Sequence, residues 1–251
     1  MTVAALAPVL LHGFLGFPRL GPIPYFRGIE TALRMRGIVP LIPALPPAGS
    51  IAERAAALAV ALRDHAAERF VLLGHSMGGL DGRFAISRLD PDRRIRAMTT
   101  VSTPHLVSSV AMRILDGSGI GSALGRAALR AALTDLDPRT RQREPIPDRP
   151  DVTYLSYVTK RRPADLPLPL RYTSRGMTEE NDGLVPVSSA AWGTVRDVVT
   201  ADHFEIVGWS LRPADRLSGR PFAHVPFWCH IVQEALTRAA DGDGDDPGTG
   251  A

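Results

Sequence analysis

The chain has 251 residues, enough for one domain with a substantial core, and doubly wound α/β folds commonly reach this length as a single unit. Hydrophobic residues make up 45% of the chain and charged residues 22%, a composition that excludes a disordered or fibrous protein. The formal net charge is +3, and the arginines are scattered, so no basic stripe predicts a nucleic-acid partner. Cys229 is the only cysteine, which excludes an internal disulfide and a cysteine-based metal site.

The first hundred residues alternate between apolar runs and segments of helical period. Runs rich in valine, isoleucine and leucine predict strands over residues 6–11, 38–42, 70–73 and 95–101. Apolar residues at helical spacing predict helices over residues 51–67 and 80–89. This alternation is typical of βαβ units, and it predicts an α/β fold with a mostly parallel central sheet flanked by helices.

Residues 106–150 interrupt this alternation. A glycine-rich stretch gives way to a helical segment of alanine, leucine and arginine, and then to charged chain broken by prolines. We therefore expect an insertion here rather than another βαβ unit. After it, strands are predicted over residues 152–158 and 195–200, and a closing helix over residues 225–239.

The whole pattern predicts a single domain over residues 1–240 that includes the insertion. The tail over residues 241–251 is rich in glycine and aspartate, so we expect it to be disordered and assign it no function. Residues 1–11 have no positively charged start, which indicates no secretory signal and predicts a cytoplasmic protein. No run approaches the roughly 18 apolar residues of a transmembrane segment.

The clearest motif is Gly74-His75-Ser76-Met77-Gly78, which spells G-x-S-x-G between a predicted strand and a predicted helix. In this context the turn holds the serine in a strained conformation with its hydroxyl raised, and the two glycines avoid clashes with neighbouring backbone. Ser76 is therefore the candidate nucleophile. The alternative is a glycine-rich turn that only joins the strand to the helix.

A serine nucleophile needs a base, and the base needs an orienting carboxylate. The histidines after the elbow are His105, His203, His224 and His230. His203 follows the last predicted strand at its carboxyl end, where such sites assemble, and is the candidate base. His224 and His230 are expected to be structural, whereas His105 is expected at the root of the insertion, lining the substrate pocket.

The candidate acid is Asp182, in the turn Asn181-Asp182-Gly183. It lies between the serine and the histidine, and the order Ser, acid, His is the one that a G-x-S-x-G elbow uses. Asp202, directly before His203, is the alternative. It is the weaker candidate because neighbouring residues in extended chain tend to point apart.

A tetrahedral oxyanion needs two backbone N–H donors, one from the residue after the nucleophile and one from the loop after an early strand. Met77 is the first candidate. Phe14 is the second, because His12-Gly13-Phe14 ends the first predicted strand. A His-Gly pair after a strand is, by itself, more often a turn than a site.

Five blocks of the sequence resemble the bacterial triacylglycerol lipases and related esterases of the α/β-hydrolase superfamily. In chain order they are Val9-Leu10-Leu11-His12-Gly13-Phe14, Gly74-His75-Ser76-Met77-Gly78-Gly79-Leu80, Ser102-Thr103-Pro104-His105, Asn181-Asp182-Gly183-Leu184-Val185 and Asp202-His203-Phe204-Glu205-Ile206. The resemblance implies the α/β-hydrolase fold and the same roles for the catalytic and oxyanion residues. It also implies that the insertion at about 106–150 forms a helical lid or cap.

Within that insertion, Ile120, Leu124, Ala128 and Ala131 fall on one helical face. The insertion starts at the carboxyl edge of the predicted sheet, beside Ser76. We therefore expect this face to cover the site entrance, with Leu124 against the acyl group of the substrate. A helix that packs on the core would give the same pattern.

Many lipases of this branch are secreted and bind a structural calcium ion through aspartates near the catalytic histidine. This chain has Glu205 two residues after His203, and no motif places a second carboxylate ligand. We therefore expect no cofactor and no metal.

Taken with the resemblance, the residues predict a carboxylic ester hydrolase, either an esterase or a lipase, that acts on a small-molecule ester through an acyl-enzyme on Ser76. An acyltransferase or a thioesterase would use the same three side chains. A non-catalytic binding protein on the same fold is a third possibility, but it would not need to keep the three together. The sequence carries no signal for a particular oligomeric state.

Overall fold

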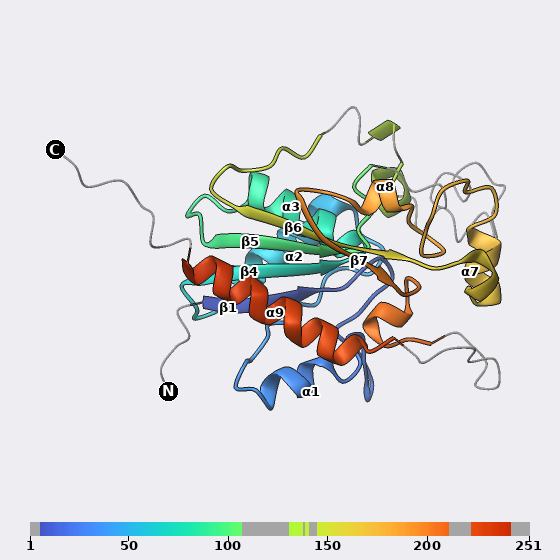
Figure 1. Cartoon of the computed structure of the whole chain (residues 1–251). Coiled ribbons are helices and arrows are strands. Elements are labelled where there is room, and N and C mark those ends of the chain that lie inside the picture. Colours follow the sequence, from blue (N-terminus) through green and yellow to red (C-terminus); the bar gives the residue numbers. More distant parts are fainter. Residues whose placement is uncertain (1–5, 107–130, 138, 141–144, 211–221, 242–251) are drawn as a thin grey trace.

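The computed structural model describes residues 6–106, 131–137, 139–140, 145–210 and 222–241. Its centre is a five-stranded, all-parallel sheet with the strand order β1-β4-β5-β6-β7. The strands are β1 (Leu6–Leu11), β4 (Arg69–His75), β5 (Ile95–Val101), β6 (Thr153–Lys160) and β7 (Thr194–Thr200). Figure 1 shows the sheet across the middle of the molecule, with helices on both of its faces.

The core has two halves, one on each face of the sheet. On one face, α1 (Ile29–Arg34) and α9 (His224–Asp241) pack on alternate side chains of the strands. On the other face, α2 (Ile51–Arg63) and α3 (Met77–Arg88) pack on the remaining ones. Both faces of β4 are buried, so residues 70–73 of this strand form a continuous apolar run.

The predicted α/β architecture is confirmed, and strands β1 and β5 have the predicted bounds. The predicted strand over residues 38–42 is wrong. Only Leu41 forms a bridge there, with Val9 of β1. Pro40 and Pro43 flank Leu41, and since proline has no N–H to donate, the segment cannot continue a ladder along the edge of β1.

The remaining elements are short, and most follow the carboxyl ends of the strands. They are β2 (Arg19–Leu20), β3 (Ile23–Pro24), η1 (Pro163–Asp165), α7 (Leu168–Thr173), α8 (Val187–Ala190) and η2 (Glu205–Val207). None of the described helices combines the length and apolar content that crossing a membrane would require.

Part of the predicted insertion is described, and it packs beside the start of α3. Residues 131–135 are helical, and Leu133, Leu136 and Ile146 belong to a buried cluster with Met77. Residues 107–130, which include Leu124, lie outside the described residues. The predicted lid therefore stays a prediction, as does the disorder expected for the tail.

Candidate active site

Ser76 occupies the turn between β4 and α3, with a φ of 55° and a ψ of −131°. A non-glycine residue at positive φ is strained, and such strain concentrates at functional sites. The turn is tightly packed: a Cβ atom on Gly74 would lie 2.5 Å from the backbone nitrogen of Gly79, and one on Gly78 would lie 2.5 Å from the carbonyl oxygen of Leu11. Both glycines are required because neighbouring backbone fills the space of a side chain.

The structure brings Ser76, His203 and Asp182 into one hydrogen-bonded row. Ser76 Oγ lies 3.0 Å from His203 Nε2, and His203 Nδ1 lies 2.8 Å from Asp182 Oδ2. The backbone N–H of His203 also donates to the Asp182 carbonyl at 3.0 Å. With Nδ1–H held by the carboxylate, Nε2 of a neutral His203 is free to accept the serine proton.

The Asp182 carboxylate is fully buried and accepts three further hydrogen bonds. Thr159 Oγ1 donates to Oδ2 at 2.7 Å, while the backbone N–H groups of Leu184 and Val185 donate to Oδ1 at 3.0 and 2.8 Å. Charge-assisted bonds of this kind stabilise the ionised carboxylate in a buried position. They also fix its orientation toward His203.

Asp202, the alternative acid, has a different environment. Its Oδ1 accepts hydrogen bonds from the backbone N–H groups of Phe204 and Glu205, at 3.0 and 2.8 Å. These bonds satisfy the start of η2, as an N-terminal cap does. Asp202 therefore shapes the loop that carries His203, whereas Asp182 contacts the imidazole.

The loop of residues 12–16, here called the oxyanion loop because it carries the predicted donor Phe14, lies against Ser76. A Cβ atom on Gly13 would lie 2.8 Å from Ser76 Cβ. The Gly13 carbonyl faces His12 Nδ1 at 3.1 Å and Arg54 Nη2 at 3.3 Å. Because the carbonyl and N–H of a trans peptide point in opposite directions, the N–H of Phe14 points away from Arg54. Met77, the other predicted oxyanion donor, begins α3. Since the first N–H groups of a helix have no partner within the helix, its N–H is left for another acceptor.

Arg54 holds this loop from inside the protein, where its side chain is fully buried. Its guanidinium donates to the carbonyl groups of His12 at 2.7 Å and Pro46 at 2.9 Å, and to Asp81 Oδ2 of α3 at 2.8 Å. Burial raises the pKa of Asp81 to about 7, and the charge of Arg54 opposes that rise. Burial likewise lowers the pKa of His12 to about 4, so this histidine is neutral at physiological pH.

His105, the predicted pocket residue, lies in a buried polar cluster. Its ring nitrogens are 3.2 Å from Thr100 Oγ1 and 3.2 Å from Arg83 Nη1, and its ring stacks on Trp192 at 5.2 Å. Burial lowers its pKa well below the usual value. These contacts anchor the chain just before the insertion. The other predicted pocket residue, Leu124, lies outside the described residues.

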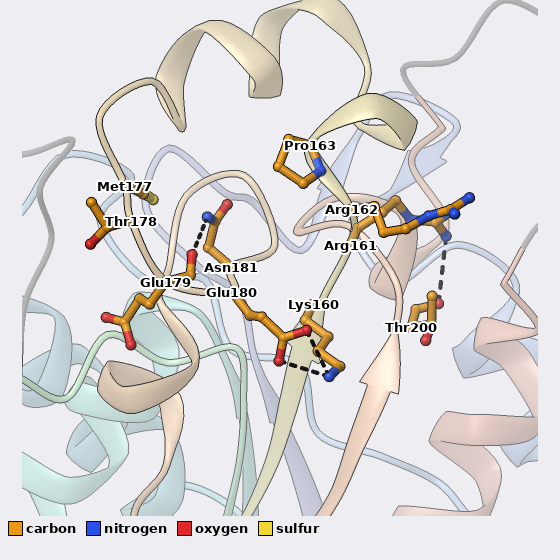
Figure 2. A pocket seen from close by; sticks show the side chains of 10 residues that line it. All are labelled: Lys160, Arg161, Arg162, Pro163, Met177, Thr178, Glu179, Glu180, Asn181 and Thr200. Carbon is orange, nitrogen blue, oxygen red and sulfur yellow. Dashed lines mark hydrogen bonds and ion pairs between the residues drawn. The ribbon is translucent and has the colours of Figure 1, made fainter.

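The surroundings of Glu205 do not fit a calcium ion. Glu205 forms a buried ion pair with Arg161, and its other oxygen accepts from the backbone N–H of Phe222 at 2.9 Å. Figure 2 shows Arg161 extending from the end of β6 toward Thr200, at the end of β7. The guanidinium already neutralises the carboxylate, and no cluster of three potential metal ligands occurs among the described residues.

Sequence reasoning missed Arg54 and Arg161, and it also missed Tyr25, whose hydroxyl accepts a hydrogen bond from the backbone N–H of Gly13. Arg54 carried a detectable signal, because it lies on the apolar face that Ile51 and Leu58 define in a predicted helix. A charged residue on such a face must find a buried partner. Arg161 and Tyr25 lie in irregular chain, where the spacing gives no such signal.

The sequence has relatives among known lipases, although no established family model matches it. Triacylglycerol lipase 2 of Saccharomyces cerevisiae is 29% identical over 218 residues, which cover 79% of this chain and 67% of the yeast protein. The triacylglycerol lipase of Pseudomonas fragi is 35% identical over 112 residues, which cover 43% of this chain and 38% of that lipase. The second similarity therefore spans less than half of either protein.

Solved structures with the same architecture include a metagenomic carboxyl esterase and a lipase of Bacillus licheniformis in its mature form. The esterase superposes with a TM-score of 0.71 at 21% identity, over 96% of this chain and 77% of its own. The lipase superposes with a TM-score of 0.70 at 19% identity, over 91% and 92%. At such identities the superpositions establish the fold alone. The chain therefore has the α/β-hydrolase fold of these esterases and lipases, and its sequence is similar to those of two triacylglycerol lipases.

Proposed function

We propose that this protein hydrolyses carboxylic esters through an acyl-enzyme on Ser76, with His203 as the base and Asp182 as the acid that orients it. The observation that carries the proposal is the row of hydrogen bonds from Ser76 Oγ to His203 Nε2 and from His203 Nδ1 to Asp182 Oδ2, at 3.0 and 2.8 Å. A serine at a strained strand-to-helix turn, paired with a histidine that a buried carboxylate orients, is the arrangement that acyl transfer requires.

In the acylation step, Ser76 Oγ attacks the ester carbonyl carbon while its proton passes to His203 Nε2. The carbonyl oxygen becomes an oxyanion, for which the N–H groups of Phe14 and Met77 are the proposed donors. When the tetrahedral intermediate collapses, the bond to the alcohol oxygen breaks and His203 returns the proton to that oxygen. The alcohol leaves, and the acyl group remains on Ser76.

Deacylation repeats these steps with water as the nucleophile. His203 takes a proton from the water as its oxygen attacks the acyl carbon, and then gives the proton to Ser76 Oγ as the acid leaves. Asp182 stays ionised throughout and stabilises the imidazolium that forms in each half of the reaction. The chemistry uses only side chains and backbone of this chain, so we propose that no cofactor takes part.

The test combines covalent labelling with turnover of p-nitrophenyl esters from acetate to longer acyl chains. We expect a fluorophosphonate probe to label the wild type at Ser76, and Ser76→Ala to remove both labelling and nearly all turnover. Ser188→Ala is the matched control, because Ser188 is exposed on α8 and bonds Glu179. Hydrolysis near the wild-type rate by Ser76→Ala would overturn the proposal.

A thioesterase or an acyltransferase would use the same acyl-enzyme, so the substrate panel must separate them. The RedJ thioesterase of Streptomyces coelicolor has a similar fold, with a TM-score of 0.50 at 20% identity. Parallel assays with matched oxygen esters and thioesters, with and without an added alcohol acceptor, distinguish the three reactions. We expect oxygen esters to be hydrolysed fastest, with water as the preferred acceptor.

A further inference from the structure

We propose that Tyr25 and His75 are positioning residues, which together hold the oxyanion loop and the backbone of His203 in register with Ser76. The inference rests on the proposed function, because it concerns the alignment of that same site. It adds two residues whose hydrogen bonds in this row involve neither Ser76 Oγ nor the ring nitrogens of His203. Tyr25 lies between β3 and α1, and His75 is the last residue of β4, directly before the nucleophile.

Three hydrogen bonds connect the parts of the site through these two side chains. The backbone N–H of Gly13 donates to Tyr25 Oη at 3.1 Å. Tyr25 Oη lies 2.7 Å from His75 Nδ1, and His75 Nε2 lies 3.0 Å from the carbonyl oxygen of His203. The row therefore runs from the oxyanion loop to the nucleophile elbow and on to the loop that carries the base.

The direction of every bond in this row is determined. The carbonyl of His203 can only accept, so His75 Nε2 must carry the proton. In a neutral imidazole Nδ1 is then an acceptor, and the Tyr25 hydroxyl must donate to it. The same hydroxyl oxygen accepts from Gly13. One tautomer of His75 and one orientation of Tyr25 satisfy all three bonds.

The surroundings keep both side chains in those states. His75 is fully buried, and burial together with the neighbouring His203 lowers its pKa well below the usual value. The two imidazole rings lie 4.8 Å apart, so a neutral His75 does not oppose the positive charge that His203 acquires during catalysis. Burial raises the pKa of Tyr25 to about 12, which keeps its hydroxyl proton in place.

Loss of the Tyr25 hydroxyl would leave two buried groups without their partners, the N–H of Gly13 and Nδ1 of His75. Both belong to segments that set the geometry around Ser76, so the expected damage is to alignment rather than to substrate binding. Small displacements of reacting groups lower kcat strongly, whereas KM reports mainly on contacts that are equal in the ground and transition states.

The first experiment compares Tyr25→Phe with Tyr157→Phe. Tyr157 is a matched control because it belongs to the core cluster against which Tyr25 packs, while its hydroxyl bonds Glu234 of α9 rather than a group of the site. We expect Tyr25→Phe to lower kcat and the rate of fluorophosphonate labelling by about tenfold or more, with KM within about twofold. Tyr157→Phe should leave kcat unchanged. Equal kcat values for the wild type and Tyr25→Phe would overturn the inference.

The second experiment is a double-mutant cycle with His75→Gln. That substitution can keep an N–H donor for the His203 carbonyl, but it removes the ring acceptor of the Tyr25 hydroxyl. If the two residues act through one row, the double variant should be little slower than the worse single variant. Losses in kcat that simply multiply would show that the two side chains act independently and would overturn the inference.

A third measurement uses the unmodified protein and therefore does not depend on how the variants fold. Nitrogen-15 NMR of the histidine rings should show His75 as the neutral Nε2–H tautomer at pH 7. A protonated Nδ1 would overturn the inference. Failure of the proposed function is recognised separately, because the wild type would then neither react with the fluorophosphonate nor hydrolyse esters.

Discussion

The guanidinium of Arg54 lies 2.7 Å from the carbonyl oxygen of His12, so a fully buried side chain of α2 holds the loop that follows β1. The same group binds Asp81 of α3, which follows the nucleophile. One arginine thus connects the helix after Ser76 to the loop that carries Phe14. The alignment of the two proposed oxyanion donors depends on it.

We expect Arg54→Lys to lower kcat by about tenfold or more, because a lysine amine lacks the fork that reaches several carbonyl groups at once. The matched control is Arg149→Lys. Arg149 also binds two carbonyl groups, those of Asp90 and Ile95, and it pairs with the carboxylates of Asp90 and Asp151, but it precedes β6 and contacts the start of β5. Both variants should melt at lower temperature, and only Arg54→Lys should lose kcat. Equal kcat losses would contradict the assignment.

Asp182→Asn should lower kcat by about 10²- to 10⁴-fold while the fold persists, because an amide favours the wrong tautomer of His203. Asp202→Asn should keep kcat within a few-fold of the wild type, since the asparagine oxygen can still cap η2. Steady-state kinetics of the two variants decide between the two aspartates. If Asp202→Asn were inactive and Asp182→Asn nearly normal, the assignment of the acid would be wrong.

Gly78→Ala should destabilise the protein by about 3 kcal/mol or more and abolish activity, because its Cβ would lie 2.5 Å from the Leu11 carbonyl and 2.8 Å from that of His12. Gly37→Ala is the comparison. Gly37 has a φ of 76° but no atom near its added Cβ, so the cost should be only about 1 kcal/mol. Denaturant unfolding of both variants measures the difference. A mild effect at Gly78 would argue against the tight elbow.

Stability should fall as the pH drops below about 6.5. Burial lowers the pKa of His12, His75 and His105, so each is neutral in the folded protein and takes up a proton on unfolding. Between its folded pKa and 6.5, each histidine then lowers the free energy of unfolding by about 1.4 kcal/mol for every unit by which the pH falls. Asp81 acts in the opposite sense, because its raised pKa makes the folded state hold a proton that the unfolded state releases. The raised pKa of Asp202 acts in the same way, so the expected net uptake is below three protons.

The change of the free energy of unfolding with pH can be measured by denaturant unfolding at a series of pH values. His105→Asn should reduce it by the contribution of one histidine. His230→Asn, which changes an exposed residue of α9, should leave it unchanged. Stability that rose steadily from pH 6.5 toward pH 4.5 would contradict the assignment of three neutral, buried histidines.

EDTA should change neither the melting temperature nor the activity, because Arg161 already neutralises Glu205. Arg161→Gln should destabilise the protein by about 3 to 5 kcal/mol, since it leaves a buried carboxylate without its cation. The control is Arg162→Gln, which removes an exposed ion pair with Asp165 and should cost about 0.5 kcal/mol at most. If EDTA lowered the melting temperature and calcium restored it, the ion pair would not be the stabilising element.

The sequence was most informative where one physical requirement dominates. Strand β1 is entirely apolar and nearly fully buried, so its apolar run defines both of its ends. Residues 38–42 have the same composition, but Pro40 and Pro43 remove donors that a ladder needs, and pattern alone overestimated the strand. The short elements β2, β3 and α1 have too few residues for any period to be detected.

For the candidate site, too, the sequence predicted some residues and not others. Ser76 was identified by its placement between strand and helix, and His203 and Asp182 by chain order. The side chains that support them were not predictable, because their partners lie far away in sequence: Tyr25 bonds His75, 50 residues later. This pair forms because the turn before α1 packs against the end of β4. No local sequence pattern predicts that packing.

Lys160 is the only lysine of the chain, and it pairs with Glu180 at 2.8 Å, just before the turn that holds Asp182. Figure 2 shows both side chains among those that line one pocket. Apart from the chain's own terminal amine, amine-reactive reagents therefore have a single target on this protein. A fluorophore or solid support coupled there would be attached in one orientation and would break an ion pair two residues before the proposed catalytic acid, Asp182.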